Sequence, residues 1–469
     1  MKGKEQKIPI TIGTYQQKDR AELEGYVGGQ TYIRITENNF ANVDKPSYGL
    51  LEQILSPSNL NRSYKRVKSN AGSGGVDEME VESLKDYLVN NKEALIQSIL
   101  DGTYRPNPVR RVEIPKDNGK KRMLGIPTVV DRVVQQAIMQ VLSPIYEKQF
   151  SNNSYGFRPR RSAHQALNQC KDYITAEYRY AVDMDLDKFF DTVNQSKLVE
   201  VLSRTIKDGR VISLIHKYLN AGVVVRNKFE ETKEGVPQGG PLSPLLSNIM
   251  LNEMDKELEI RRHRFVRYAD DLVILCKSKR SAERTLTNII PFIENKLFLK
   301  VNKEKTVVAY ISNIKFLGYS FYVRNKEGRL RLHPKTITKM KARIKELTSR
   351  SNGWGDVRRK ETLRQYITGW VNYFKLADMK SLLPTVDEWY RRRLRMVIWK
   401  QWKRIKTRLR NLIILGIDKH KAWEYANTRK SYWRTANSPI LTRTIGNDRL
   451  KLAGYIFFTD YYRYVNGIN

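Results

Sequence analysis

The residues best placed to do chemistry are two adjacent aspartates in the tetrapeptide Tyr268-Ala269-Asp270-Asp271. Apolar residues precede them at Phe265-Val266 and follow them at Leu272-Val273-Ile274-Leu275, which predicts two strands joined by a turn that carries both carboxylates. Neighbouring carboxylates between apolar strands repel each other unless a strong positive charge compensates them, and a divalent metal ion supplies such a charge. Because aspartate is also common in solvated turns, this motif alone leaves an ordinary hairpin turn open.

A second acidic segment, Tyr180 to Asp191, lies far upstream. The alternation of a strand places Asp183, Asp185 and Asp187 on one face and leaves Met184 for the interior. Taken alone, this segment could also be an exposed edge strand that carries charges. Together the two segments predict one oxygen-rich site, with an aspartate from a central strand and two from a neighbouring hairpin, suited to a pair of Mg²⁺ ions.

The rest of the chain predicts the elements that position these aspartates. Apolar periodicity indicates helices over residues 50–67, 129–150 and 198–219, with a hairpin over 104–127 and a strand at 223–225. Around the aspartates the order is strand, helix, hairpin, helix, strand, which suits a ferredoxin-like domain. Beyond about residues 329–334 the pattern becomes helical, with one apolar stripe at Leu363, Tyr366, Ile367, Trp370, Val371 and Phe374. We therefore expect an α+β fold followed by a helical domain.

The net charge indicates a polyanionic partner. The 469 residues include 85 Lys and Arg but 49 Asp and Glu, a formal net charge of +36, which an enzyme of small metabolites does not need. The last part is the most basic, because residues 331–469 hold 32 basic and 10 acidic residues. Residues 391–410 form a predicted basic helix with ten basic and no acidic residues, which predicts contact with a phosphate backbone, although a solvated basic face or a membrane-surface helix stays open.

Composition also excludes several classes of protein. No apolar run approaches the roughly 18 to 20 residues of a membrane span, and the polar N-terminus lacks a secretory signal, so we expect a cytoplasmic bacterial protein without a membrane partner. Cys170 and Cys276 are the only cysteines and are expected to be reduced core residues. The five histidines are scattered, which argues against a structural zinc site.

Several ordered blocks carry a resemblance to a known family. They are Asp185 with Phe190-Asp191, Arg111 to Lys116 with Arg122 and Gly125-Ile126-Pro127, Ser154 to Pro159, Gly235 to Pro244, Tyr268 to Asp271, Val301 to Thr306, and Phe316 to Tyr319. In this order they resemble the reverse transcriptases, and most closely the bacterial group II intron reverse transcriptase/maturases, from about Leu51 to about Tyr462. The cysteine pairs of the family's DNA endonuclease domain are absent, so we expect an endonuclease-lacking member similar to the compact class C proteins.

The resemblance implies a right-hand polymerase with fingers and a ferredoxin-like palm, followed by an α-helical thumb/maturase (X) domain. The expected divisions are residues 1–45, an extension of unknown role, 46–330, the fingers and palm, and 331–469, the thumb/maturase domain. The implied function is RNA-directed DNA polymerisation, together with binding of group II intron RNA to assist splicing and mobility. Two alternatives stay open: a domesticated reverse transcriptase in phage defence or spacer acquisition without an intron partner, and an RNA-binding splicing factor with an idle palm.

By the same likeness, Asp185, Asp270 and Asp271 are the expected catalytic residues, and with Leu186 they are the expected ligands of two Mg²⁺ ions. In nucleotidyl transfer a primer 3′-hydroxyl attacks the α-phosphorus of a deoxynucleoside triphosphate in line, which requires carboxylates to converge on both ions. The expected nucleotide-binding residues are Lys116, Arg122, Phe190, Gln238 and Lys305. Open alternatives are a solvated basic hairpin for the first two, a core aromatic for Phe190 and a solvated lysine for Lys305.

The template-primer duplex and the intron RNA are the remaining partners that the resemblance implies. A primer grip is expected at Phe316, Leu317 and Gly318. The expected nucleic-acid contacts are Arg110, Arg111, Arg158, Arg391, Arg392, Arg393, Lys403, Arg404 and Arg408. Oligomeric state, the identity of the intron and the DNA target are left undetermined by the sequence.

Overall fold

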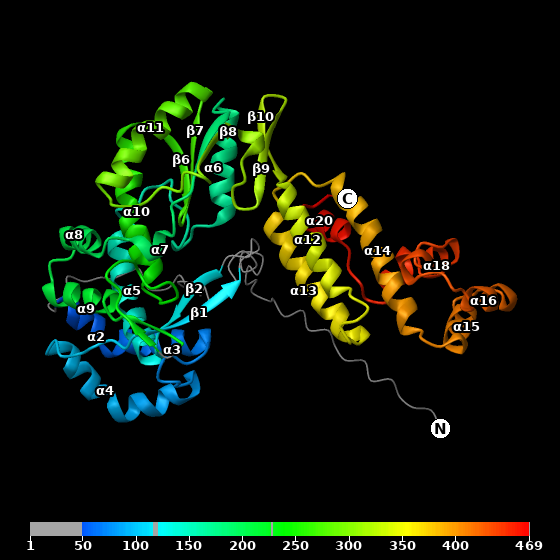
Figure 1. The fold of residues 1–469 in the computed structure, drawn as a ribbon, viewed down its shortest axis with the longest axis horizontal. Helices are drawn as coiled ribbons and strands as arrows, with labels where there is room; N and C mark the ends of the chain where they lie inside the picture. The colour runs from blue at the N-terminus through cyan, green and yellow to red at the C-terminus, as the bar shows by residue number, and fades with distance from the viewer. Residues whose placement is uncertain (1–48, 116–120, 227, 469) are drawn as a thin grey trace. The chain divides into compact units, whose positions relative to one another are not determined.

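The computed structural model describes residues 49–115, 121–226 and 228–468, which divide into two compact units (Figure 1). The N-terminal unit comprises the described residues up to 338 together with Leu376–Asp378. The C-terminal unit comprises Lys339–Lys375 and residues 379–468. The extension expected at residues 1–45 and the turn Asp117-Asn118-Gly119 lie outside the described residues. The expected division at residue 330 stays a prediction. The two compact units separate at residue 338, which lies within a helix.

The N-terminal unit mixes helices and strands. Its helical elements are α2 (Leu50–Leu55), α3 (Pro57–Asn70), η1 (Val81–Ser83), α4 (Leu84–Leu100), α5 (Val129–Glu147), α6 (Ala163–Thr175), α7 (Phe189–Thr192), α8 (Gln195–Thr205), α9 (Gly209–Leu219), α10 (Ser243–Ile260), α11 (Lys279–Asn295) and η2 (Ile311–Asn313). Its strands are β1 (Val109–Pro115), β2 (Lys121–Ile126), β3 (Tyr180–Met184), β4 (Val223–Val225), β5 (Lys228–Glu230), β6 (Arg264–Tyr268), β7 (Asp271–Cys276), β8 (Val307–Tyr310), β9 (Tyr319–Arg324) and β10 (Glu327–Leu332).

The strands form three sheets. The central sheet has the order β6-β7-β3-β8 and is antiparallel throughout, and α11 packs along β3, β7 and β8 (Figure 1). A second sheet, β2-β1-β4-β5, contains the hairpin of β1 and β2, and β9 pairs with β10 in a separate hairpin. The expected alternation of strand, helix, hairpin, helix and strand is therefore confirmed for the central sheet, which is the α+β palm-like arrangement.

Local capping explains where several helices begin. The side chain of Thr128 accepts a hydrogen bond from the backbone N–H of Asp131 at the start of α5, and Ser162 and Gln165 form a reciprocal capping box at the start of α6. The helix expected over 198–219 is wrong as one element, because α8 ends at Thr205 and α9 begins at Gly209. Asp208 caps the second helix by accepting from the N–H of Arg210, which ends the continuous helical hydrogen bonding.

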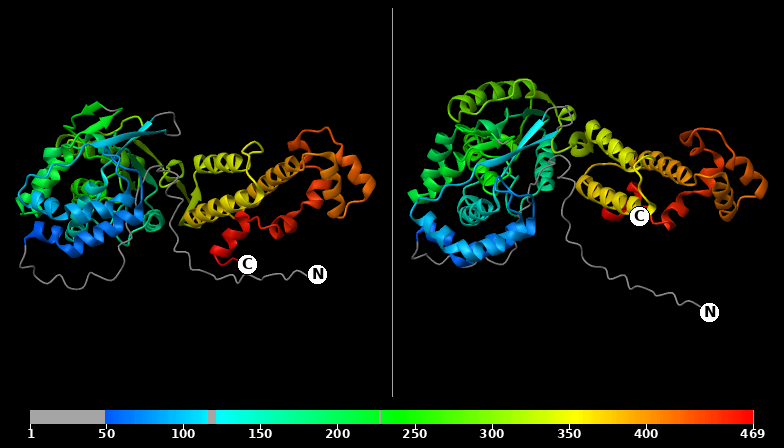
Figure 2. Two further views of the ribbon diagram at one scale, coloured as in Figure 1. Left: turned by 90° about the horizontal axis from the view of Figure 1, so that it is seen from below. Right: turned by 60° about the horizontal axis from the view of Figure 1, so that its bottom comes forward.

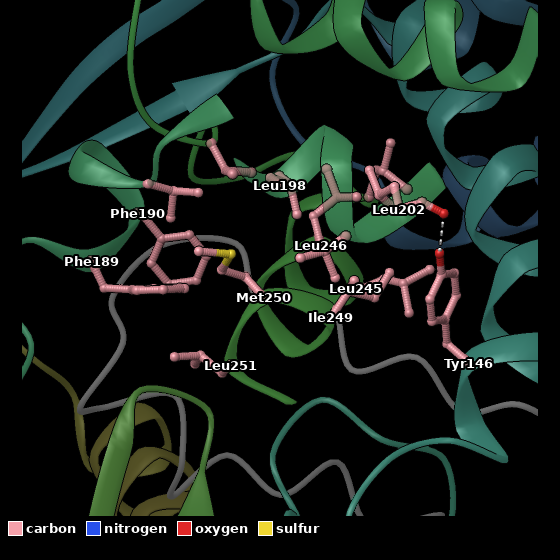
Figure 3. Packing of buried hydrophobic residues seen from close by; sticks show 14 of the residues in the cluster. Tyr146, Phe189, Phe190, Leu198, Leu202, Leu245, Leu246, Ile249, Met250 and Leu251 are labelled. Atoms are coloured by element: carbon pink, nitrogen blue, oxygen red, sulfur yellow. Dashed lines mark hydrogen bonds between the residues drawn. The ribbon is translucent and has the colours of Figure 1, made fainter. Parts of the chain in front are cut away.

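The core of the N-terminal unit joins the central sheet to α5, α8, α9, α10 and α11. Figure 3 shows Phe189 and Phe190 beside Met250 of α10, with Leu246 and Ile249 continuing the apolar surface along the same helix. Full burial of side chains of this size contributes about 1.5 to 3 kcal/mol each relative to exposure. This packing places the segment after β3 firmly between the sheet and α10.

The C-terminal unit is helical, as expected. It contains most of α12 (Pro334–Leu347) and α13 (Asp356–Phe374), α14 (Leu382–Gln401), α15 (Ile405–Ile414), α16 (Lys419–Ala426), α17 (Tyr432–Thr435), α18 (Pro439–Thr444), α19 (Asn447–Leu452) and α20 (Phe458–Val465). Helix α20 packs against α13 and α14 (Figure 2), and Phe458 meets the ring of Trp370 edge-on at 5.4 Å. The basic helix expected over 391–410 is wrong as one element, because α14 ends at Gln401 and α15 begins at Ile405.

Candidate active site

The strand register brings the two acidic segments together. Strand β3 pairs with β7 so that Met184 lies opposite Leu272. Because Asp185 follows Met184 and Asp271 precedes Leu272, the same antiparallel register carries these two aspartates to facing positions at the end of the sheet. Asp270 lies in the two-residue turn between Tyr268 and Asp271, which are themselves paired across β6 and β7.

The electrostatics of the cluster reflect this proximity. Desolvation, followed by repulsion from Asp270, Asp183 and Asp185, raises the pKa of Asp271 to about 7, and Lys315 opposes the shift. Burial and then repulsion from Asp185 raise the pKa of Asp183 to about 6, again opposed by Lys315. Asp271 nevertheless retains exposed surface, so its carboxylate can be reached from solvent. The protein therefore gathers negative charge here without fully compensating it.

The donor set fits a hard divalent cation by its chemistry. Its members offer carboxylate oxygens, the ligands that Mg²⁺ prefers, and their mutual repulsion is the imbalance that a cation relieves. Among the described residues, no group of three or more His, Cys, Asp or Glu side chains is arranged as the ligands of one ion. Leu186, the other expected ligand, is buried and forms an isolated antiparallel β-bridge with Val301.

A lysine contacts the cluster directly. The ammonium of Lys305 donates to Asp185 at 2.8 Å, and both side chains are partly exposed. The loop that carries this lysine is fastened to β3, because the N–H of Asn302 donates to the carbonyl of Asp185 at 2.9 Å. Lys305 is thus ion-paired at the acidic site while its side chain stays 58% exposed, so the alternative of a solvated lysine stays open and its contact with a nucleotide stays a prediction.

Phe190 is mainly a core residue. It is 8% exposed and meets Phe189 edge-on at 5.3 Å (Figure 3). Its carbonyl accepts from the N–H of Val236 at 2.7 Å, which ties α7 to the loop that precedes α10. The alternative of a core aromatic is confirmed, and contact of the same ring with a sugar stays a prediction.

The glycines of the 235–240 loop have a protein partner. The N–H of Gly125 donates to the carbonyl of Gln238 at 2.7 Å, and a Cβ added at Gly239 would collide with the carbonyl oxygen of Gly125. Gly239 also has a φ of +129°, which favours glycine. At Gly239 the backbone thus approaches strand β2 closely, and this contact alone accounts for the glycine. Contact of Gln238 with a nucleotide stays a prediction.

The expected primer grip is a tight turn. Phe316 and Tyr319 exchange backbone hydrogen bonds of 3.1 and 2.9 Å, and Leu317 and Gly318 both have positive φ angles, +51° and +83°. The hydroxyl of Thr336 donates to the carbonyl of Gly318 at 2.7 Å. The turn is therefore held rigidly at both ends, although its contact with a primer stays a prediction.

Two arginines expected to bind nucleic acid are buried, and for them the expectation is wrong. Arg158 donates to the carboxylate of Glu147 and to the carbonyls of Ser151 and Ser154. Arg393 donates to the hydroxyl of Thr348 at 2.6 Å and to the carbonyls of Lys345 and Thr348. Both guanidinium groups stabilise the fold, because a buried charge must be paired and hydrogen-bonded.

The other basic residues differ in how available they are. In the C-terminal unit three half-buried arginines lie over aromatic rings and so contribute to packing. The distance from Cζ to the ring centroid is 4.0 Å for Arg392 over Trp433, 4.8 Å for Arg408 over Trp399 and 5.6 Å for Arg391 over Phe457. Lys403 and Arg404, between α14 and α15, are exposed.

In the N-terminal unit Arg111 pairs with Asp191 at 3.3 Å. Arg110 is half-buried, and its Nε has no hydrogen-bond partner among the residues that the structure describes. Lys116 and the side chain of Arg122 lie outside the described residues.

One buried residue of this site escaped the sequence argument. Arg267 immediately precedes the Tyr268 to Asp271 turn and is fully buried, where it pairs with Asp255. The available signal was a charged residue inside the otherwise apolar strand Phe265-Val266-Arg267. A buried arginine requires a buried acid, but the sequence does not show which of the 49 acidic residues it is.

Comparisons with known proteins agree with the geometry. The profile of the family described as "Reverse transcriptase (RNA-dependent DNA polymerase)" matches residues 114–321, and that of "Group II intron, maturase-specific domain" matches residues 337–413. Protein YkfC of Escherichia coli is 35% identical over 336 residues, which cover 63% of this chain and 88% of that protein. Group II intron-encoded protein LtrA of Lactococcus lactis is 33% identical over 357 residues, covering 62% of this chain and 59% of LtrA. No described helix has the length and apolar character needed to cross a membrane.

Proposed function

The chain belongs to the group II intron reverse transcriptase/maturase family, and from this premise we propose that Asp185, Asp270 and Asp271 are its catalytic residues. The family's activity is RNA-directed DNA polymerisation joined to a maturase function in intron splicing. The observation that carries the assignment is the register that sets Asp185 opposite Asp271, one residue from Asp270. The mutual repulsion expressed in the raised pKa of Asp271 supports it.

Reverse transcriptases use divalent metal ions, and the finer proposal is that these three aspartates, with the backbone at Leu186, hold two Mg²⁺ ions. Bound there, the ions would lower the barrier by neutralising charge on the reacting phosphate and activating the primer hydroxyl. The chain contributes the rigid sheet end that brings the carboxylates from distant segments to one place. It also contributes the hydrogen bond between Asn302 and the Asp185 carbonyl, which orients the end of β3.

Deoxynucleoside triphosphate binding is proposed to involve Lys305, Gln238 and Phe190, with Lys116 and Arg122 from the segment around the β1–β2 turn. Lys305 supports this role because its ammonium already lies 2.8 Å from Asp185, within side-chain reach of a triphosphate bound at the same carboxylates. An ammonium there would stabilise negative charge that develops on the leaving pyrophosphate. Phe190 is proposed to limit the space beneath the sugar and so to disfavour a 2′-hydroxyl.

Intron RNA and the template-primer duplex are proposed as the macromolecular partners. The exposed Lys403 and Arg404 and the basic excess of residues 331–469 support a phosphate-binding surface on the C-terminal unit. The turn at Phe316 to Gly318 is proposed to contact the primer strand. Since the chain spans 59% of LtrA, activities of the remaining part of that relative are not assigned to this chain.

The decisive experiment compares Asp270→Asn with Asp187→Asn in primer extension on an RNA template with Mg²⁺. Asp187 is half-buried just beyond β3, and its described hydrogen bonds are made by its backbone. We expect Asp270→Asn to lower extension by at least about 1000-fold with RNA affinity within twofold, and Asp187→Asn to retain activity within about threefold. Equal loss in both variants, or loss of RNA binding together with extension, would contradict the assignment.

A further inference from the structure

The turn that carries Asp270 and Asp271 has an unusual backbone. Ala269 has a φ of +56°, in the left-handed region that residues other than glycine adopt reluctantly. It is also buried, at 1% exposure, so water does not satisfy its peptide groups. A residue in this conformation persists only where its surroundings hold it. The contacts around Ala269 therefore determine how the next two carboxylates point.

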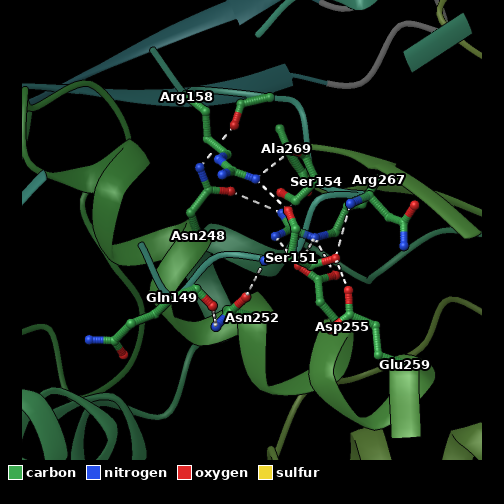
Figure 4. A network of polar contacts seen from close by, with 12 residues as sticks. Gln149, Ser151, Ser154, Arg158, Asn248, Asn252, Asp255, Glu259, Arg267 and Ala269 are labelled. Carbon is green, nitrogen blue, oxygen red and sulfur yellow. Dashed lines mark hydrogen bonds and ion pairs between the residues drawn. The ribbon is translucent and has the colours of Figure 1, made fainter. Parts of the chain in front are cut away.

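A buried arginine provides the first of these contacts (Figure 4). Arg267 Nη1 donates to the carbonyl oxygen of Ala269 at 2.9 Å. Asp255 of α10 aligns the same guanidinium. Nε of Arg267 donates to Oδ1 and Oδ2 of Asp255 at 2.8 and 3.0 Å, and Nη2 donates to Oδ2 at 2.5 Å. Both side chains are fully buried. The fork geometry leaves Arg267 a single orientation, so α10 sets the direction from which the Ala269 carbonyl is held.

Asn248 of α10 completes the arrangement from the other side (Figure 4). Its Oδ1 accepts from Arg267 Nη1 at 2.9 Å, and its Nδ2 donates to the carbonyl of Gly156 at 2.9 Å. Gly156 in turn lies against the turn, because a Cβ added there would collide with the amide nitrogen of Ala269. Asn248 is 1% exposed and uses both ends of its amide. The peptide of Ala269 is thus gripped between Arg267 and Gly156, with Asn248 connecting the two.

We propose that Asp255, Asn248 and Arg267, acting with Gly156, form a clamp that sets the positions of Asp270 and Asp271 for polymerisation. These are positioning residues, because they act on the two aspartates through the peptide of Ala269. The inference rests on the proposed function of the two aspartates. It also explains why a basic residue occupies the buried strand directly before the acidic turn.

The test compares Asn248→Ala with Asn252→Ala in the full chain. Asn252 lies one turn further along α10 and is 4% exposed. It also uses both ends of its amide, in hydrogen bonds with the backbone of Ser151 and Gln149, but neither of these hydrogen bonds reaches the described turn. The two variants should therefore lose similar thermal stability. We expect Asn248→Ala to lower kcat at least tenfold and raise the Mg²⁺ concentration for half-maximal activity several-fold, with KM for template-primer within twofold. Asn252→Ala should retain kcat within about twofold.

Amide hydrogen exchange supplies a readout that does not depend on activity. Exchange at residues 268–272 should rise at least tenfold in Asn248→Ala and stay unchanged in Asn252→Ala. Gly156→Ala leaves the hydrogen-bonding side chains intact but presses on the turn, and it should lower kcat in the same way. Equal losses of kcat in Asn248→Ala and Asn252→Ala would overturn the clamp. Unchanged amide exchange at residues 268–272 in Asn248→Ala would overturn it as well. If the unmodified chain shows no polymerase activity, the proposed function is overturned. Faster amide exchange at residues 268–272 in Asn248→Ala would in that case still support the clamp.

Discussion

Replacing Arg158 with alanine separates a structural arginine from a nucleic-acid contact. Its side chain is 3% exposed and donates to both carboxylate oxygens of Glu147, with Nε at 3.1 Å from each and Nη2 at 2.7 Å from one. Nη1 donates to the carbonyls of Ser151 and Ser154, the latter at 2.8 Å (Figure 4). The guanidinium therefore joins α5 to the loop before α6, and each of its three nitrogens donates a hydrogen bond within the protein.

The expected cost follows from what the substitution leaves behind. Removing one partner of a fully buried ion pair costs about 3 to 5 kcal/mol, because the remaining charge is uncompensated. Glu147 keeps 28% of its side chain exposed and can be rehydrated, which reduces that penalty. The carbonyls of Ser151 and Ser154 lose their donor as well. We therefore expect Arg158→Ala to lower the free energy of unfolding by about 2 to 4 kcal/mol.

The assay pairs urea unfolding with RNA binding at several salt concentrations, and Arg160→Ala is the matched control. Arg160 is two residues away and exposed, so its loss should change stability by less than about 0.5 kcal/mol. Arg158→Ala should leave the salt dependence of RNA affinity unchanged, because no phosphate contact is lost. A stable Arg158→Ala protein with a flatter salt dependence would refute the structural assignment.

Three further outcomes are expected. Because the pKa values of Asp271 and Asp183 are raised to about 7 and about 6, the folded chain binds protons that the unfolded chain does not, so without metal its stability should rise as pH falls from 8 to 5. Thermal melts of Asp271→Asn should show a shallower rise, and an identical pH dependence would count against the carboxylate cluster. Replacing exposed Lys403 and Arg404 together with alanine should reduce the salt slope of RNA binding by about 1.5 without lowering the melting temperature; an unchanged slope would remove these residues from the RNA surface. Phe190→Ala should cost about 3 kcal/mol of stability and admit ribonucleotides more readily in competition primer extension, and unaltered sugar discrimination would leave the ring a core residue only.

Much of the fold follows from local patterns. The hairpin with Asp270 and Asp271 at its turn, the strand before Asp185 and the helices over 50–70 and 129–147 each have the expected type. Apolar periodicity and turn residues act within a few positions, so a local pattern is enough to predict them. One error lies where a single polar residue interrupts a long apolar pattern. Asp208 divides one expected helix by accepting a backbone N–H, a short-range effect that the apolar stripe conceals.

Charge was the least reliable guide to individual residues. Composition predicted a polyanion-binding chain, but it could not separate Lys403, which is exposed, from Arg393, which lies ten residues earlier and is buried against Thr348. Arginine serves both purposes because its long side chain carries several donors that satisfy buried carbonyls as readily as phosphates. Burial, which decides between the two, depends on packing between helices that are distant in sequence.

By itself the amino-acid sequence determined the acidic motifs, their order, the alternating elements around them and the basic excess, since each is a property of residue type and spacing. Only the tertiary structure decided that Asp185 faces Asp271, that Lys305 reaches the same carboxylates, and that Asn248 and Asp255 hold the turn through Arg267. These pairings join segments up to 120 residues apart. They depend on sheet register and helix packing, which arise from the chain's combined burial of apolar surface and which no local pattern specifies.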